Sequence, residues 1–190
     1  YPIVCELLAD KLARWADKGM NKKIRAMIVG IPNVGKSSFI NRIAGSKKAK
    51  VENRPGVTLN KQWVSSDIGL ELLDMPGVLW PKFEEKRVRE NLALTGAIKD
   101  KIMDTEELAM ILCDRLRKIA PEAFAARYKL TEADGYDALD AYDLFELIGR
   151  KRGFLMAGGT VNHERTADTL LGEFRSGTIG QISLEEPKKA

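Results

Sequence analysis

The chain has 190 residues, of which 44% are hydrophobic, so it can form one ordinary globular domain or two small ones. Its apolar runs are shorter than the roughly 18 residues that span a bilayer, and its start lacks the features of a signal peptide, so we expect a cytoplasmic protein without membrane contact. The net charge of +4 favours nucleic acid only weakly, and two distant cysteines indicate neither a disulfide framework nor a zinc site.

Three elements are predicted before residue 45. Apolar residues at steps of three and four over residues 3–18 favour an amphipathic helix that ends at Gly19. The apolar run 24–29 favours a buried strand, and residues 38–44 have the spacing of a helix.

Between that strand and that helix lies a complete G-x-x-x-x-G-K-[ST] pattern, which is typical of a phosphate-binding loop. Its glycines allow a tight turn that leaves backbone N–H groups for the phosphates. Lys36 is expected to reach the β- and γ-phosphates, and Ser37 to bind Mg²⁺. A plain glycine turn with a solvated lysine is disfavoured by the full pattern in its strand–loop–helix context. The predicted nucleotide-binding residues here are Gly30, Pro32, Asn33, Val34, Gly35, Lys36, Ser37 and Ser38.

Two further parts of a GTPase site follow in the expected order. Thr58 lies in a turn-rich loop and is expected to join the Mg²⁺ shell. Residues 62–66 and 70–74 are predicted strands joined as a hairpin, and the second ends in a D-x-x-G sequence. Its Asp74 is expected near Mg²⁺, and Gly77 is expected to offer its N–H to the γ-phosphate.

After about residue 100 the pattern becomes helical. Asp104 is a predicted N-cap for a helix that continues to Ile119. Two more helices are expected, one over residues 139–148 that ends near Gly149 and one over residues 167–174. We therefore predict a P-loop GTPase domain over residues 1–100 and an all-α domain over residues 101–190.

The sequence contains no N-K-x-D motif for guanine recognition, and its motifs resemble one particular family. The segments 30–37, 54–58, 74–84 and 94–100 resemble those of the ribosome biogenesis GTPase A family, also called YlqF or RbgA. The resemblance implies an α/β P-loop GTPase fold that is circularly permuted and incomplete here, followed by a helical, RNA-contacting module. It also implies that guanine recognition lies upstream of the P-loop, and that this chain corresponds to the C-terminal two-thirds of such a protein.

The resemblance further implies GTP and GDP as ligands, with Mg²⁺ held by Ser37, Thr58 and Asp74. The implied partners are the large ribosomal subunit and its rRNA, rather than DNA. Nucleotide state would control binding to the maturing subunit and release from it. Two other interpretations stay open, namely a P-loop ATPase or small-substrate kinase, and an RNA-binding module whose nucleotide is purely structural.

Catalytic assistance is not evident in the sequence. Val78 occupies the position of the water-orienting glutamine in Ras-like enzymes, so help must come from elsewhere, such as a partner, an upstream segment or a monovalent cation. Asn33 matches the asparagine that helps to bind K⁺ in GTPases with a similar P-loop. The competing interpretation is that Asn33 only stabilises its own loop.

Several cations near the expected helix ends are candidates for RNA contacts, although a solvated surface explains them equally well. His163 is interpreted as a solvated loop residue rather than a catalytic one, and Trp63 as part of the packing. Trp80, in the second switch loop, is open to either packing or partner contact. The candidate RNA-contacting residues are Arg150, Lys151, Arg152, Arg165 and Arg175.

Overall fold

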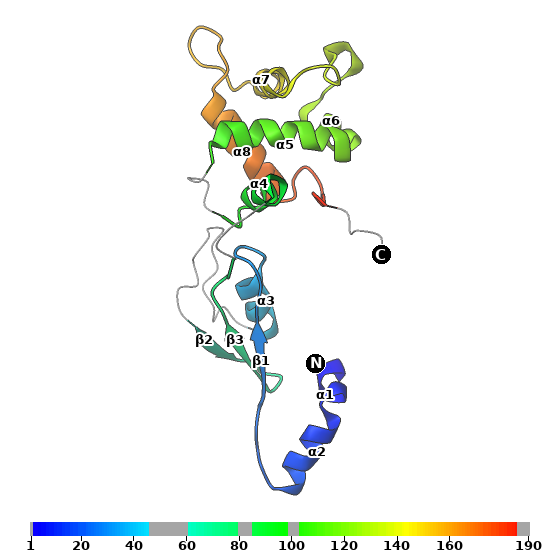
Figure 1. Cartoon of the computed structure of the whole chain (residues 1–190), viewed down its shortest axis with the longest axis vertical. Helices are drawn as coiled ribbons and strands as arrows, with labels where there is room; N and C mark the ends of the chain where they lie inside the picture. The colour runs from blue at the N-terminus through cyan, green and yellow to red at the C-terminus, as the bar shows by residue number, and fades with distance from the viewer. Residues whose placement is uncertain (1, 46–60, 80–84, 99–102, 186–190) are drawn as a thin grey trace. The chain divides into compact units, whose positions relative to one another are not determined.

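The computed structural model describes residues 2–45, 61–79, 85–98 and 103–185. Two compact units are present, Tyr1–Trp80 and Pro81–Ala190, and Figure 1 shows the elements of each. We expected a boundary near residue 100. The units divide twenty residues earlier because Arg115, in the helical part, donates hydrogen bonds to Glu90 and Asn91. Whether residues 1–100 act as one functional domain stays a prediction.

The predicted N-terminal helix is interrupted. It consists of α1 (Pro2–Leu7) and α2 (Ala9–Asp17), separated at Leu8, whose backbone leaves the helical region. Its end at Gly19 is as predicted. Gly19 takes a φ of 61°, and the N–H of Met20 donates to the carbonyl of Trp15 at 2.8 Å, which satisfies an orphan carbonyl of the last turn.

A three-stranded sheet forms the centre of the first unit. Its order is β1 (Ile24–Ile28), β3 (Leu70–Asp74) and β2 (Gln62–Ser65), with β1 parallel and β2 antiparallel to β3. The β2–β3 hairpin confirms the predicted one. Ile28 is paired with Asp74, so β1 and β3 end at the same edge of the sheet. This register brings the loop after β1 and the D-x-x-G segment together.

The sheet has one covered and one exposed face. Alternate residues of the strands, among them Val64 and Leu72, are buried with Ile40 of α3 (Lys36–Ile43), which lies beside the strands in Figure 1. Trp63 points the other way and is 51% exposed, with the Arg25 guanidinium 5.0 Å from its ring centre. The interpretation of Trp63 as a packing residue is therefore wrong, because its register places it on the exposed face.

The second unit is helical. Its central α5 (Thr105–Ile119) contacts α4, α6, α7 and α8 and buries Leu108, Leu112 and Leu116 completely. Asp104 caps α5 as predicted, accepting from the N–H groups of Glu106 and Glu107. The other elements are α4 (Lys86–Leu94), α6 (Pro121–Tyr128), the 3₁₀ turn η2 (Glu132–Asp134), α7 (Ala141–Lys151) and α8 (His163–Arg175).

The helix predicted to end near Gly149 ends two residues later, at Lys151, so Gly149 is not itself the stop. It lies inside α7, where an added Cβ would fall 2.3 Å from Cγ1 of Val161 and 2.9 Å from Oγ1 of Thr166. Gly149 is thus needed for close packing, and the helix ends instead before Gly153, whose φ is 68°. Of the helices in the described ranges, none is long and apolar enough to cross a membrane.

Candidate nucleotide-binding site

The loop between β1 and α3 has the backbone that the glycine pattern predicts. Gly30 and Gly35 adopt φ values of 156° and 87°, which disfavour residues with a Cβ. Gly35 is the N-cap of α3, so the N–H groups of the first helical turn point out towards the loop. An anion held there meets amide donors and the positive end of the helix dipole.

Lys36 lies across this loop. Its Nζ donates to the carbonyl oxygen of Ile31 at 2.8 Å. Partial burial lowers the pKa of Lys36 from its ordinary value, while the charge of Asp74 acts in the opposite direction. An ammonium held by one neutral carbonyl can exchange that partner for a phosphate, which offers a charged acceptor.

Ser37 and Asp74 meet at the mouth of the loop. The Ser37 hydroxyl donates to Oδ2 of Asp74 at 2.8 Å, and Asp74 is only 2% exposed. Its other oxygen, Oδ1, is buried and has no hydrogen-bond partner among the described residues. A buried carboxylate oxygen without a partner is costly in an apo protein, and a hard divalent cation that takes oxygen ligands suits it. These two residues therefore fit Mg²⁺, whereas the predicted third ligand, Thr58, lies outside the described residues.

The D-x-x-G segment is packed against the P-loop. A Cβ on Gly77 would lie 2.5 Å from the nitrogen and 2.6 Å from the Cα of Pro32. The N–H of Val78 donates to the carbonyl of Gly30 at 3.3 Å. Val78 itself is 70% exposed and has no polar side-chain atom to orient a water molecule.

Asn33 has a φ of 59°, a conformation that asparagine tolerates better than most residues. This conformation by itself favours asparagine at this position, whether or not a cation binds beside it. Of the other predicted loop residues, Val34 and Ser38 are exposed and Pro32 is half-buried. The predicted nucleotide-binding residues that the structure describes thus form one cluster at the carboxyl edge of β1 and β3.

The candidate RNA-contacting cations differ in how far protein partners occupy them. Arg175 donates to the carbonyls of Ala93 and Leu94, where it caps the end of α4. Lys151 pairs with Asp134 at 2.8 Å, and Arg152 pairs with Glu173 at 2.6 Å.

Arg150 and Arg165 are more available. Arg150 pairs with Glu146 at 3.1 Å, but its side chain stays 59% exposed. Arg165 is exposed, with its guanidinium 4.5 Å from the ring centre of Phe154. A guanidinium stacked on an aromatic ring keeps its in-plane donors available.

His163 is not a solvated loop residue, which corrects the sequence interpretation. It is the first residue of α8, its Nε2 contacts Oε1 of Glu146, and its ring lies edge-on to Tyr142 and Phe145. The cap at Asn162, whose side chain accepts from the N–H of Arg165, starts α8 four residues earlier than expected. An Asn before a polar helical turn was the sequence signal for this start.

Comparison with known families matches residues 25–136 to a family described as 50S ribosome-binding GTPase. The chain belongs to this family of GTPases. The match covers the P-loop, Asp74 and Gly77, and it confirms the family resemblance seen in the motifs.

Similar proteins agree with this assignment. The chain is 47% identical over 187 residues to the ribosome biogenesis GTPase A of Priestia megaterium, covering 97% of this chain and 64% of that protein. It is 30% identical over 164 residues to the Thermotoga maritima protein of the same name, covering 86% of this chain and 57% of the other. The chain thus spans about two-thirds or less of these relatives.

Solved structures show the same fold. A GDP-bound YlqF matches with a TM-score of 0.57 and 26% identity, covering 93% of this chain and 66% of that one. The GNP-bound YlqF from T. maritima matches with a TM-score of 0.54 and 27% identity, covering 94% and 66%. The predicted fold class, a P-loop GTPase part with a helical part after it, is confirmed.

Proposed function

We propose that this chain binds GTP and GDP with Mg²⁺ and hydrolyses GTP as part of a ribosome assembly factor. The observation that carries the proposal is the pair Ser37–Asp74 beside a complete P-loop, in which the buried Oδ1 of Asp74 has no hydrogen-bond partner in the described part of the chain. Family membership favours this function over a P-loop ATPase or a small-substrate kinase.

The proposed Mg²⁺ ligands or near neighbours are Ser37, Thr58 and Asp74. When bound, Mg²⁺ would neutralise charge on the β- and γ-phosphate oxygens. Lys36 would leave the Ile31 carbonyl for those phosphates, and the first turn of α3 would donate its N–H groups to them. These groups bind and orient the nucleotide before any bond is broken.

The contact between Gly77 and Pro32 supports a switch in this site. The D-x-x-G segment rests on the P-loop backbone, so a shift of the loop around the phosphates reaches residues 77 and 78 directly. We propose that nucleotide state moves this segment and thereby controls binding to and release from the maturing large ribosomal subunit. Names of relatives, such as ribosome biogenesis GTPase A, support the assembly role.

Hydrolysis needs help that Val78 does not give. We propose that K⁺ bound near Asn33 supplies positive charge beside the phosphates, in the role of an arginine finger. Faster GTP hydrolysis in K⁺ than in Na⁺ supports this part of the proposal, and equal rates contradict it without affecting nucleotide binding.

The proposed partner is rRNA of the large subunit, contacted in the cytoplasm by the helical unit. Arg150 and Arg165 are the best candidates because both are exposed. Lys151, Arg152 and Arg175 would have to leave protein partners before they reach a phosphate. Any such binding should weaken steeply with salt.

Displacement of a fluorescent guanine nucleotide by GTP and by ATP, in Mg²⁺ and K⁺, tests the proposal. If GTP displaces the fluorescent nucleotide at a much lower concentration than ATP does, the result supports a GTPase. Equal displacement by the two nucleotides contradicts guanine specificity in this chain and favours the ATPase or kinase interpretation. Affinity for rRNA that is equal with GDP and a GTP analogue contradicts the switch.

A further inference from the structure

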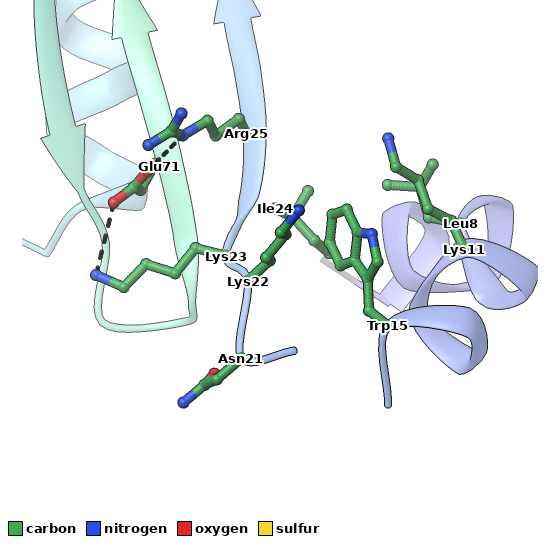
Figure 2. A pocket seen from close by; sticks show the side chains of 9 residues that line it. All are labelled: Leu8, Lys11, Trp15, Asn21, Lys22, Lys23, Ile24, Arg25 and Glu71. Atoms are coloured by element: carbon green, nitrogen blue, oxygen red, sulfur yellow. Dashed lines mark hydrogen bonds and ion pairs between the residues drawn. The ribbon is translucent and has the colours of Figure 1, made fainter. Parts of the chain in front are cut away.

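A second pocket, of about 610 Å³, lies at the other edge of the sheet from the P-loop. It is lined by α2, the segment that leads into β1, and the starts of β1 and β3, as Figure 2 shows. β1 rises about 13 Å between its first and last residues, so this pocket is separate from the phosphate-binding loop.

The lining of this pocket is strongly basic. Four cationic side chains, Lys11, Lys22, Lys23 and Arg25, line the pocket together with one carboxylate, Glu71. Figure 2 shows that Glu71 is shared by two of them, with Lys23 at 3.7 Å and Arg25 at 2.8 Å. Among the described residues, neither Lys11 nor Lys22 has a carboxylate within ion-pair distance. Four cations against one carboxylate leave the lining with a net charge of +3, and Lys11 and Lys22 supply two of these charges.

Trp15 lies between these two lysines. Its indole extends from α2 towards the segment before β1. The Nζ atoms of Lys11 and Lys22 are 5.2 Å and 6.0 Å from the ring centre. Cation–π contacts of this kind are weak when exposed, and a lysine stem is flexible, so either ammonium can leave the ring for a stronger partner.

An aromatic face flanked by mobile cations is the arrangement that binds single-stranded nucleic acid. A base stacks on the ring, and the phosphates on either side of it take the cations. We infer that the pocket around Trp15 binds a single-stranded RNA segment, with one base on the indole and the flanking phosphates on Lys11 and Lys22. An acidic peptide would use the lysines but gain nothing from the indole face.

This inference deepens the proposed function, on which it rests for the source of the RNA, the maturing ribosomal subunit. It places an RNA contact on the unit that carries the P-loop, in addition to the proposed contacts of the helical unit. Because the pocket and the P-loop lie at opposite ends of β1, a defect in one can be measured without a defect in the other.

The test uses the full chain and an oligoadenylate of roughly ten nucleotides. Trp63→Phe with Trp80→Phe leaves Trp15 as the only one of three tryptophans, so its fluorescence reports directly on stacking. We expect RNA binding to quench the fluorescence of Trp15.

Variants test the same contact by affinity. Trp15→Leu should weaken RNA binding about tenfold or more, whereas Trp15→Phe should retain most of the affinity. Lys11→Gln and Lys22→Gln should each reduce the salt dependence by about 0.7 in the log–log slope.

Lys18→Gln is the matched control, because Lys18 is exposed at the end of α2 but does not line the pocket. Each variant is also tested for binding of a fluorescent GDP. Unchanged RNA affinity in both lysine variants, with GDP binding intact, overturns this inference and leaves the proposed function standing. An oligoglutamate peptide is also tested as a competitor. If it displaces the oligoadenylate as strongly as unlabelled RNA does, and RNA binding does not quench Trp15, the inference is overturned as well. RNA binding that depends on Trp15 in a chain that binds no nucleotide supports this inference and contradicts the proposed function.

Discussion

Gly77 and Pro32 are so close that a Cβ on the glycine would lie 2.5 Å from the proline nitrogen. The two nearest atoms belong to the backbone and the third, Cγ at 2.8 Å, belongs to the proline ring, so none of them can rotate aside as a flexible side chain can. The D-x-x-G segment is therefore fitted to the P-loop, and the fit requires glycine at its fourth position.

Gly77→Ala should separate this segment from the P-loop. Relief of the clash requires a backbone shift, which typically costs about 1–3 kcal/mol of unfolding free energy. We expect a lower thermal midpoint and weaker binding of a GTP analogue. Val78→Ala is the control, because it changes an exposed neighbour without adding an atom near Pro32. If the two variants behave alike, the contact has no role in the switch.

Gly149→Ala should destabilise the helical unit. The new Cβ would meet Val161 at 2.3 Å and Thr166 at 2.9 Å, so we expect a loss of about 1–3 kcal/mol in chemical denaturation. Adding Val161→Ala should restore part of the loss by removing the nearer atom. Gly172→Ala, in helix α8 with no neighbour within 4 Å of its Cβ position, should instead be neutral or stabilising by up to about 1 kcal/mol. Equal losses at positions 149 and 172 would rule out close packing as the reason for Gly149.

Asp134 predicts an acid-dependent contribution to stability. Hydrogen bonds from Lys151 and then from Thr131 lower the pKa of Asp134 from 3.8 to about 2. A carboxyl group with a depressed folded-state pKa stabilises the fold above its unfolded pKa, and that contribution disappears as the pH falls from about 4 to about 2. The difference in unfolding free energy between the wild type and Asp134→Asn should therefore shrink across this range. A difference that stays constant with pH would contradict the depressed pKa, which carbon-detected NMR titration of the carboxyl group can measure directly.

Arg165 and Arg175 should behave differently although both were predicted RNA contacts. Arg175→Gln removes hydrogen bonds to the carbonyls of Ala93 and Leu94, so it should lower the unfolding free energy by about 1–3 kcal/mol. Arg165→Gln should leave stability nearly unchanged and should weaken binding of rRNA fragments by the full chain, with a smaller salt dependence. If Arg175→Gln folds but loses RNA affinity, while Arg165→Gln keeps it, then Arg175 is the RNA contact and Arg165 is not.

The nucleotide site could be predicted from the sequence because its parts are local. A strand, a glycine loop, a helix start and a D-x-x-G each occupy a few consecutive residues, and parallel pairing of β1 with β3 then brings Ser37 to Asp74. The end of α2 at Gly19 was equally local.

The errors depend on contacts between residues that are distant in sequence. Gly149 resembles a helix stop, and only Val161 and Thr166 show that it is a packing position. His163 looked solvated because nothing nearby in the chain indicates Glu146 as its partner. Helix α6 is different, since Pro121 at its first turn was a usable signal that the sequence interpretation did not include.

The most direct test of the central claim is calorimetric titration of GDP into the chain, with Mg²⁺ and with EDTA, in the wild type and in Asp74→Asn. The account predicts that Mg²⁺ strengthens GDP binding to the wild type about tenfold or more and has little effect on the variant, since a carboxamide offers no charge to the ion. It also predicts that the variant is not destabilised in the apo state, because a neutral carboxamide costs less to bury than a carboxylate with an oxygen that lacks a partner among the described residues. An equal effect of Mg²⁺ on both proteins would contradict a metal site at Ser37 and Asp74.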